Sequence, residues 1–203
     1  MDLPRVEREL KKRLVYPYIW GRKQSNNCDR LTNFIYTTYS FESLLRKIYH
    51  LKREIKNYAM NRWYNYWSAM AVEDIFNSHP NVTANKNRYD KLVDFSINSL
   101  PFDHKTTVYP RGYSKPFTYA LENKEDLILW LYQNQSQQGR KHLKNRLFIV
   151  LYDSNFEHWK MKAEIALLKQ NIDEYVKKFS EENLCIFDFG DGKVFSDIIW
   201  IIR

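Results

Sequence analysis

The sequence predicts an α/β protein in which a central mixed sheet of about four or five strands is flanked by helices and preceded by an N-terminal helical segment. Three observations support this fold class. Residues 41–77 have helical periodicity, and residues 147–152 form a continuous apolar run of strand length. Residues 92–108 contain two short runs of strand type on either side of a turn signal. No repeat is evident, and no linker separates a second domain.

The N-terminal segment at residues 2–14 is predicted to be a short basic helix. Its apolar face is formed by Val6, Leu10 and Leu14. Pro17 ends this helix because proline lacks the N–H that a helix interior needs. Residues 15–40 are aromatic and polar and contain turn-forming Gly and Asn, so they are expected to be mostly loop.

A strong helical pattern covers residues 41–77 and begins at Ser40, a residue type that caps helix N-termini. The first apolar positions of the pattern are Leu44, Leu45, Ile48, Leu51 and Ile55. The pattern fits either one long helix or two helices joined near Asn57. Pro80 marks its end, because the residue before a proline disfavours helical backbone angles.

The second half of the chain is predicted to alternate helices and strands. A helix at 121–133 has an acidic first turn, and the run at 147–152 is expected to be a buried strand near the centre of the sheet. A further amphipathic helix covers 157–179. The segments 184–189 and 194–202 are predicted to pair as a hairpin across two glycines.

The hairpin between residues 92 and 108 carries the residues of greatest chemical interest. Asn98-Ser99 is the turn signal between its two strands. Asp103 and Lys105 are two positions apart on a strand and therefore share a face. If the hairpin closes around the turn, Asp94 comes roughly opposite them. Carboxylates are the ligands that Mg²⁺ prefers, and a nearby lysine can orient water or bind a phosphate, so this is a candidate phosphodiester-cutting site.

This pattern resembles the PD-(D/E)xK motif of the restriction-endonuclease-like superfamily. Asp94 matches the acid of the first half of the motif, and Asp103-His104-Lys105 matches the second half. Val93 stands where the motif has its proline. The resemblance covers roughly residues 60–155, and the order helix, strand, hairpin, strand fits the family core. Glu73 matches the glutamate that the superfamily often carries on the preceding helix.

The resemblance implies an endonuclease that hydrolyses DNA with Mg²⁺ or Mn²⁺ and that serves in restriction or defence. Asp94 and Asp103 would bind the metal, Glu73 would complete or hydrogen-bond the metal site, and Lys105 would position and help to deprotonate the attacking water. His104 is expected to offer only its backbone carbonyl as a metal ligand, because its side chain should face away from the acids. A homodimer is expected for a double-strand break, because one active site cuts one strand.

Two alternatives stay open at this level. Aspartate and lysine on one strand face are most often a solvated surface pair. The chain would then be a basic module that binds nucleic acid, or a catalytically inactive protein with a nuclease fold. Against this, Asp94 and Asp103 lie directly beside Phe95 and Phe102, and an unpaired carboxylate is costly to bury without a function.

The charge of the chain favours a polyanionic partner. The 203 residues include 32 Lys plus Arg against 24 Asp plus Glu, which gives a net charge of +8 and a pI near 9.3. Nucleic acid is the simplest such partner, because phosphate neutralisation releases counterions. The basic residues expected to contact DNA are Arg140, Lys141 and Lys144, together with Arg111 in the loop at 109–117. Arg146 extends the first of these clusters.

Composition also excludes several classes. Only 5 glycines are present and none forms a phosphate-binding loop, so P-loop chemistry is excluded. Cys28 and Cys185 lack zinc-site spacing and are expected to be reduced thiols. No signal peptide and no membrane span are evident, so a cytoplasmic protein is expected. The chain is expected to be one domain, 1–203, with a mostly helical extension at 1–60, a nuclease-like core at 61–155 and a C-terminal helix and hairpin at 156–203.

Overall fold

The computed structural model describes residues 1–203 except 21–24, 88–89, 91, 135–142 and 191. The chain divides into two compact units. Residues 1–74 and 159–168 form the helical unit, and residues 75–158 and 169–203 form the sheet unit. Each unit is described by itself below.

The helical unit consists of short helices and most of one long helix. Its elements are α1 (Leu3–Lys12), η1 (Arg13–Val15), α2 (Asn26–Leu31), η2 (Asn33–Thr37), α3 (Phe41–Ile48), α4 (Arg53–Asn77) up to Asp74, and most of η3 (His158–Ala163). The N-terminal helix is confirmed, and Val6 and Leu10 on its apolar face are buried. Ser40 caps α3 as predicted, since its Oγ accepts a hydrogen bond from the Ser43 N–H at 3.1 Å.

The core of the helical unit is built around aromatic side chains of α4. Trp63 is fully buried, its ring centroid lies 5.3 Å from that of Phe41, and its Nε1–H donates to the Thr38 carbonyl at 2.6 Å. Burial of a large indole with its one polar atom satisfied is a strongly stabilising combination. The aromatic residues of 41–77 therefore serve mainly as core in this unit.

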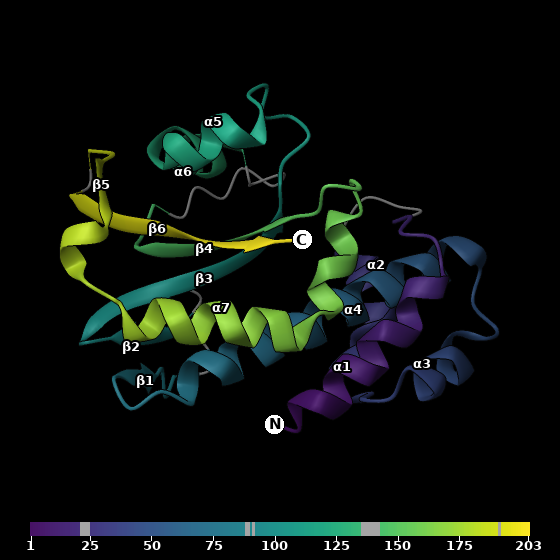
Figure 1. Ribbon diagram of the computed structural model, residues 1–203. Helices are drawn as coiled ribbons and strands as arrows, with labels where there is room; N and C mark the ends of the chain where they lie inside the picture. The colour runs from purple at the N-terminus through teal and green to yellow at the C-terminus, as the bar shows by residue number, and fades with distance from the viewer. Residues whose placement is uncertain (21–24, 88–89, 91, 135–142, 191) are drawn as a thin grey trace. The chain divides into compact units, whose positions relative to one another are not determined.

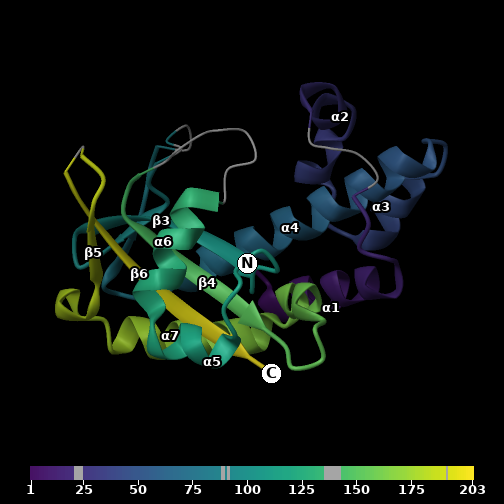
Figure 2. The ribbon, with the colours of Figure 1, turned by 90° about the horizontal axis from the view of Figure 1, so that it is seen from above.

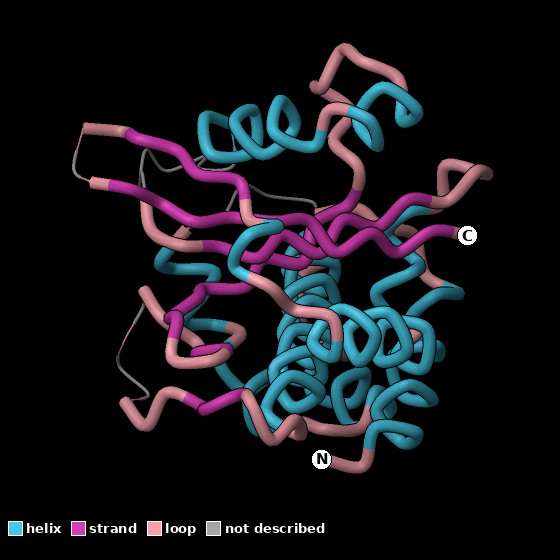
Figure 3. The backbone as a smooth tube through the Cα atoms, turned by 60° about the vertical axis from the view of Figure 1, so that its left-hand side comes forward, coloured by secondary structure: helices cyan, strands magenta, loops and turns pink. Residues whose placement is uncertain are grey.

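The sheet unit contains one six-stranded mixed sheet, which confirms the predicted fold class with more strands than the four or five expected. Its strands are β1 (Val82–Ala84), β2 (Phe95–Ile97), β3 (Leu100–Val108), β4 (Arg146–Tyr152), β5 (Cys185–Asp188) and β6 (Lys193–Ile202). The order in the sheet is β1-β2-β3-β4-β6-β5. The pairs β3–β4 and β4–β6 are parallel and the other three pairs are antiparallel. Figure 3 shows the strands in magenta.

The strand β4 lies at the centre of this sheet, as its apolar sequence predicts. Residues 147–151 are all completely buried, because helices cover both faces of the sheet. On one face lie α5 (Phe117–Glu122) and α6 (Lys124–Asn134), which contribute Leu131 to the cluster around Phe148 (Figures 1 and 2). The part of α7 (Ile165–Lys177) that belongs to this unit lies on the other face (Figure 1).

Some helix boundaries differ from the sequence predictions. The pattern at 41–77 is two helices, but the break falls at residues 49–52 rather than near Asn57. The helix predicted at 121–133 is divided into α5 and α6 at Asn123. Only the second part of 157–179 is α-helix, after the 3₁₀ turn η3. Apolar periodicity continues across such short interruptions, so it does not locate them.

The expectation that residues 15–40 are mostly loop is wrong for the second half of that segment. It contains α2 and η2, and Ser25 begins α2 by accepting a hydrogen bond from the Cys28 N–H at 3.3 Å. Such short helices depend on capping and on packing against α4 more than on periodicity. Within the described part of the chain, no helix combines the length and the apolar character that crossing a membrane requires.

Candidate active site

The hairpin that carries the motif closes around Asn98 and Ser99, as predicted. Both residues have positive φ, 49° and 72°, the combination that a two-residue hairpin turn with the favourable twist requires. Ile97 pairs with Leu100, and Phe95 pairs with Phe102. The paired register ends at Phe95, where the Asp94 N–H donates to the Phe102 carbonyl at 2.8 Å and so holds Asp94 beside Asp103. The two acids therefore lie next to each other at the edge of the buried phenylalanine pair.

Asp94 is held by the backbone and the side chain of His104. Its Oδ2 is 2.8 Å from the backbone N of His104, which donates to it, and 2.7 Å from the ring Nδ1. The ring also stacks on Phe95, with centroids 6.0 Å apart. Burial would raise the pKa of Asp94, but the bonds to His104 outweigh this and hold the pKa below its usual value. The expectation that the His104 side chain faces away from the acids is therefore wrong.

Asp103 is paired with Arg146, which lies beside it in the parallel register of β3 and β4. Nε and Nη2 of Arg146 both lie 2.5 Å from Asp103 Oδ2. The guanidinium carbon is 5.9 Å from the ring centroid of Tyr132 and 5.8 Å from that of Phe148. Burial raises the pKa of Asp103, Arg146 opposes this rise, and the charge of Asp94 adds to it. Together these effects raise the pKa of Asp103 above its usual value.

Asp94 and Asp103 behave as one pair of interacting carboxylates. Each affects the pKa of the other, and the two values move in opposite directions. This separation is typical of neighbouring acids that cannot both ionise freely. The bonds from His104 and Arg146 all end on Oδ2, and a hydrogen bond with the Asp103 side chain also lowers the pKa of Asp94. Neither His104 nor Arg146 bonds to an Oδ1 atom of the pair.

Lys105 lies on the same face of β3 as Asp103 and beside Phe148 of β4. Desolvation by the surrounding protein lowers the pKa of Lys105, the positive charge of Arg146 lowers it further, and Asp103 opposes both effects. The residue is nevertheless exposed, so contact with water moderates the shift. An ammonium with a lowered pKa is better suited to exchange a proton than an ordinary lysine.

Glu73 lies on α4 in the helical unit, whereas Asp94 and Asp103 belong to the sheet unit. Burial raises the pKa of Tyr66 on the same helix, and the charges of Tyr36 and Glu73 add to that rise. Within the described residues, no three His, Cys, Asp or Glu side chains gather closely enough to hold a metal ion. The four predicted metal ligands are therefore not assembled as one group.

The predicted DNA-binding residues are only partly described. Arg140 and Lys141 lie outside the described residues. Lys144 is exposed just before β4, and its carbonyl accepts a hydrogen bond from the Tyr132 hydroxyl at 2.8 Å. Arg111 is also exposed, but it follows the carboxyl end of β3, roughly 17 Å along the strand direction from Asp103. Arg111 is therefore not grouped with the paired acids.

Arg146 is the site residue whose role the sequence did not reveal. It was grouped with the phosphate-binding cluster, but the structure pairs it with Asp103. Its position at the first residue of a buried strand was the one signal of a special environment. The sequence separation of 43 residues from Asp103 means that only the register of two neighbouring strands could identify its partner.

No protein-family model, no curated protein and no solved structure matches this chain, so the site must be interpreted from its own chemistry.

Proposed function

We propose that this protein is a divalent-metal-dependent phosphodiesterase that hydrolyses DNA as an endonuclease. The observation that supports this most is the coupled pair Asp94 and Asp103, with Lys105 two residues further along the same strand face. This is the set of groups that the resemblance to the PD-(D/E)xK motif requires. A role in restriction or defence and a homodimer that cuts both strands belong to the same proposal.

The donor set suits Mg²⁺ or Mn²⁺ through its two carboxylates. Mg²⁺ in enzymes is usually bound by one or two carboxylates and keeps several waters, which substrate phosphates can replace. The raised pKa of Asp103 reflects burial beside the charge of Asp94, and a cation held by the two carboxylates would reduce that repulsion. Glu73, which the resemblance offers as a third acid, belongs to the helical unit and is not part of this donor set.

Each residue has a distinct role in the proposed reaction. When bound, the metal supplies Lewis-acid stabilisation of charge on the phosphate. His104 keeps the Asp94 carboxylate in one orientation through its two bonds. Lys105 holds the attacking water and accepts its proton, which a lowered pKa favours. Arg146 places a second positive charge beside Asp103 that can neutralise a phosphate oxygen of the substrate.

Cleavage of supercoiled plasmid with Mg²⁺ or Mn²⁺ tests the proposal. The wild type should nick the plasmid, and Lys105→Ala and Asp94→Asn should each reduce the rate by about 100-fold or more, because each removes a group that acts on the water or the metal. Glu73→Gln reports whether the third acid takes part. Lys177→Ala, which changes an exposed lysine of α7 in the same unit and away from the acid pair, serves as the matched control and should retain most of the activity.

DNA binding without metal separates catalysis from folding. In a metal-free buffer, Asp94→Asn and Asp103→Asn should bind DNA as well as the wild type or more tightly, because each change removes negative charge near the phosphate backbone. Much weaker binding by these variants would mean that the acids support the fold, and the nuclease proposal would then fail.

A second candidate function is favoured by the pairing of both acids within the protein. His104 bonds to Asp94, and Arg146 pairs with Asp103, so each acid has a partner within the protein. Such pairing suits a basic nucleic-acid-binding module or a nuclease fold that has lost turnover. A shift in DNA mobility without nicking, at any divalent metal concentration, would favour this candidate.

A further inference from the structure

The positive charge of the chain is concentrated in the helical unit. Residues 1–74 and 159–168 contain 16 Lys plus Arg against 9 Asp plus Glu, a formal charge of +7. The sheet unit contains 16 Lys plus Arg against 15 Asp plus Glu, a formal charge of +1. The unit that carries the candidate active site is thus nearly neutral, and attraction to a polyanion must come mainly from the other unit.

Several basic residues of the helical unit are paired with acids. The ion pairs are Lys11 with Glu7 and Glu164, Lys12 with Glu9, Arg46 with Glu42, and Arg62 with Asp29. In contrast, within the part of the chain that the structure describes, Lys52, Arg53 and Lys56 form no ion pair with an acid. These three residues lie between the end of α3 and the first turn of α4.

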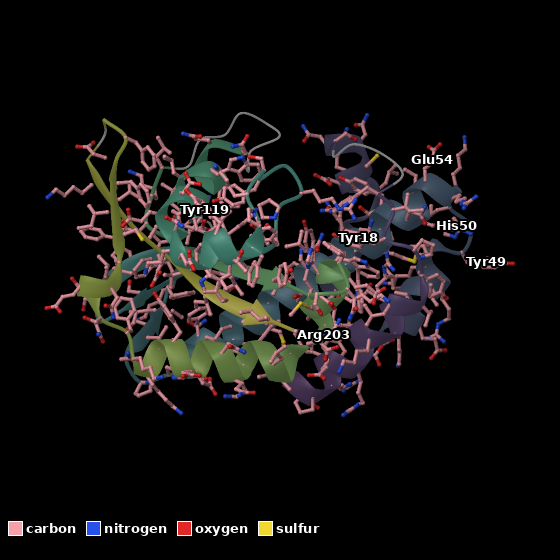
Figure 4. The ribbon with its side chains drawn as sticks, turned by 45° about the horizontal axis from the view of Figure 1, so that its top comes forward. Tyr18, Tyr49, His50, Glu54, Tyr119 and Arg203 are labelled. Atoms are coloured by element: carbon pink, nitrogen blue, oxygen red, sulfur yellow. The ribbon has the colours of Figure 1, made fainter. Side chains whose placement is uncertain are left out.

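The same place carries the most exposed aromatic ring of this unit. Tyr49 is 81% exposed, and the ammonium of Lys56 lies 5.5 Å from its ring centroid. Figure 4 shows Tyr49 pointing away from the ribbon, with His50 and Glu54 beside it. We call Tyr49, His50, Lys52, Arg53 and Lys56 the basic corner. It combines a free ring face with three cations within eight residues of chain.

We infer that the basic corner binds single-stranded nucleic acid, with a base stacked on Tyr49 and neighbouring phosphates on Lys52, Arg53 and Lys56. An exposed aromatic ring among cations is the arrangement by which proteins hold single strands without sequence preference. Bases inside a duplex are already stacked on one another, so the ring has no base face to contact there. This inference does not depend on the proposed nuclease activity, because it concerns a different unit of the chain.

An anionic membrane is the other polyanion that a basic aromatic surface can contact. Membrane-binding surfaces insert aliphatic and aromatic side chains together. The exposed neighbours of Tyr49 are His50, Lys52, Arg53 and Glu54, all of them polar or charged, so no apolar face is offered for insertion. The chemistry of the basic corner therefore favours nucleic acid over lipid.

Fluorescence anisotropy with a labelled single strand of about 16 nucleotides in metal-free buffer tests the inference. Tyr49→Ala should weaken binding by about 5- to 100-fold, the range for loss of one base–aromatic stack. Tyr49→Phe keeps the ring and should bind within about 2-fold of the wild type, again because the stack is retained. The combined change Lys52→Ala, Arg53→Ala and Lys56→Ala should lower the log–log salt slope by about 2, because each phosphate contact contributes about 0.7 for single strands.

The chain offers a matched control in the sheet unit. Lys115 lies over the ring of Tyr119 at 5.1 Å, a lysine–tyrosine pair like that of Lys56 and Tyr49. Tyr119→Ala should leave binding unchanged, because its unit carries almost no net charge. Circular dichroism of each variant checks that the fold is retained, and DNA and RNA strands of one sequence show which sugar is preferred.

Three results would overturn the inference. The first is Tyr49→Ala binding as tightly as the wild type, and the second is an equal loss with Tyr119→Ala. The third is binding to vesicles of anionic lipid that Tyr49→Ala abolishes while single-strand binding is unaffected. Every binding measurement is made without metal, whereas plasmid cleavage requires it. The protein can therefore bind single strands at the basic corner and still show no cleavage, so each result tests only its own proposal.

Discussion

Replacing Arg146 with methionine tests the electrostatic account of the candidate active site. Methionine keeps the apolar stem that packs beside Tyr132 and Phe148 and removes only the guanidinium. In the variant, Asp103 keeps Asp94 as a close neighbour and has lost its positive partner. We expect a lower free energy of unfolding at neutral pH, because an ionised carboxylate is then left half-buried beside another acid.

The size of the effect follows from the geometry. Two donor nitrogens contact one carboxylate oxygen, and the side chains of Arg146 and Asp103 are 13% and 19% exposed. Charge centres roughly 4 Å apart interact by roughly 4 kcal/mol at an effective dielectric constant of 20. Because Arg146 need not be desolvated in the variant and both groups still touch water, we expect a net loss of about 2 to 3 kcal/mol.

The dependence on pH gives the sharpest form of this prediction. Loss of Arg146 moves the pKa of Asp103 further upward, so the folded variant binds a proton more readily than the unfolded chain. The loss of stability is therefore complete at pH values above the pKa of Asp103 in the folded variant. It disappears as the pH falls below the pKa of an aspartate in the unfolded chain, about 4. Urea unfolding at pH 7 and at pH 4 should show a large difference between variant and wild type at pH 7 and a small one at pH 4.

The double variant Arg146→Met with Asp103→Asn completes the test. It should recover at least half of the loss, because no unpaired charge remains at the position of Asp103. If Arg146→Met destabilises the protein equally at both pH values, or if the double variant recovers nothing, Arg146 acts through packing alone. Either result would refute the inference that Asp103 is an ionised carboxylate whose repulsion by Asp94 is offset by Arg146.

Two further predictions concern stability elsewhere in the sheet unit. Asp153 is 1% exposed and its pKa is lowered, because the hydrogen bonds from Arg203 and the Asn155 N–H outweigh burial, so Asp153→Asn should cost about 1 to 2 kcal/mol at pH 7 in urea unfolding. Since the folded pKa lies below the unfolded one, that cost should shrink as the pH falls below about 4, and a constant cost would contradict the assignment. Gly192 has φ of 111°, so Gly192→Ala should strain the β5–β6 hairpin and cost about 1 kcal/mol or more, whereas Ser180→Ala, outside the hairpin, should have little effect in the same thermal unfolding measurement.

Local pattern in the sequence was sufficient for the main elements of the fold. The five buried residues of β4 form an apolar run that only a strand covered on both faces would contain. Asn98-Ser99 specified the turn of the β2–β3 hairpin, because Asn tolerates positive φ more readily than most residues. Asp94 and Asp103 were placed opposite each other by the alternation of a strand and the position of that turn.

The partners of those acids were decided by tertiary structure. Asp103 meets Arg146 because β3 and β4 are parallel neighbours in one register, and a separation of 43 positions in the sequence gives no local signal of that register. The His104 ring reaches Asp94 at the point where β2 begins, where strict alternation of faces no longer holds. The division of the chain at Asp74, inside α4, likewise depends on packing rather than on any break in helical pattern.

The sequence by itself determined the secondary structure, the hairpin and the acids worth examining, because periodicity and turn preference act over a few residues. Tertiary structure alone decided that both acids are paired and that almost all the net charge lies in one unit, because ion pairing and charge distribution depend on which distant segments become neighbours.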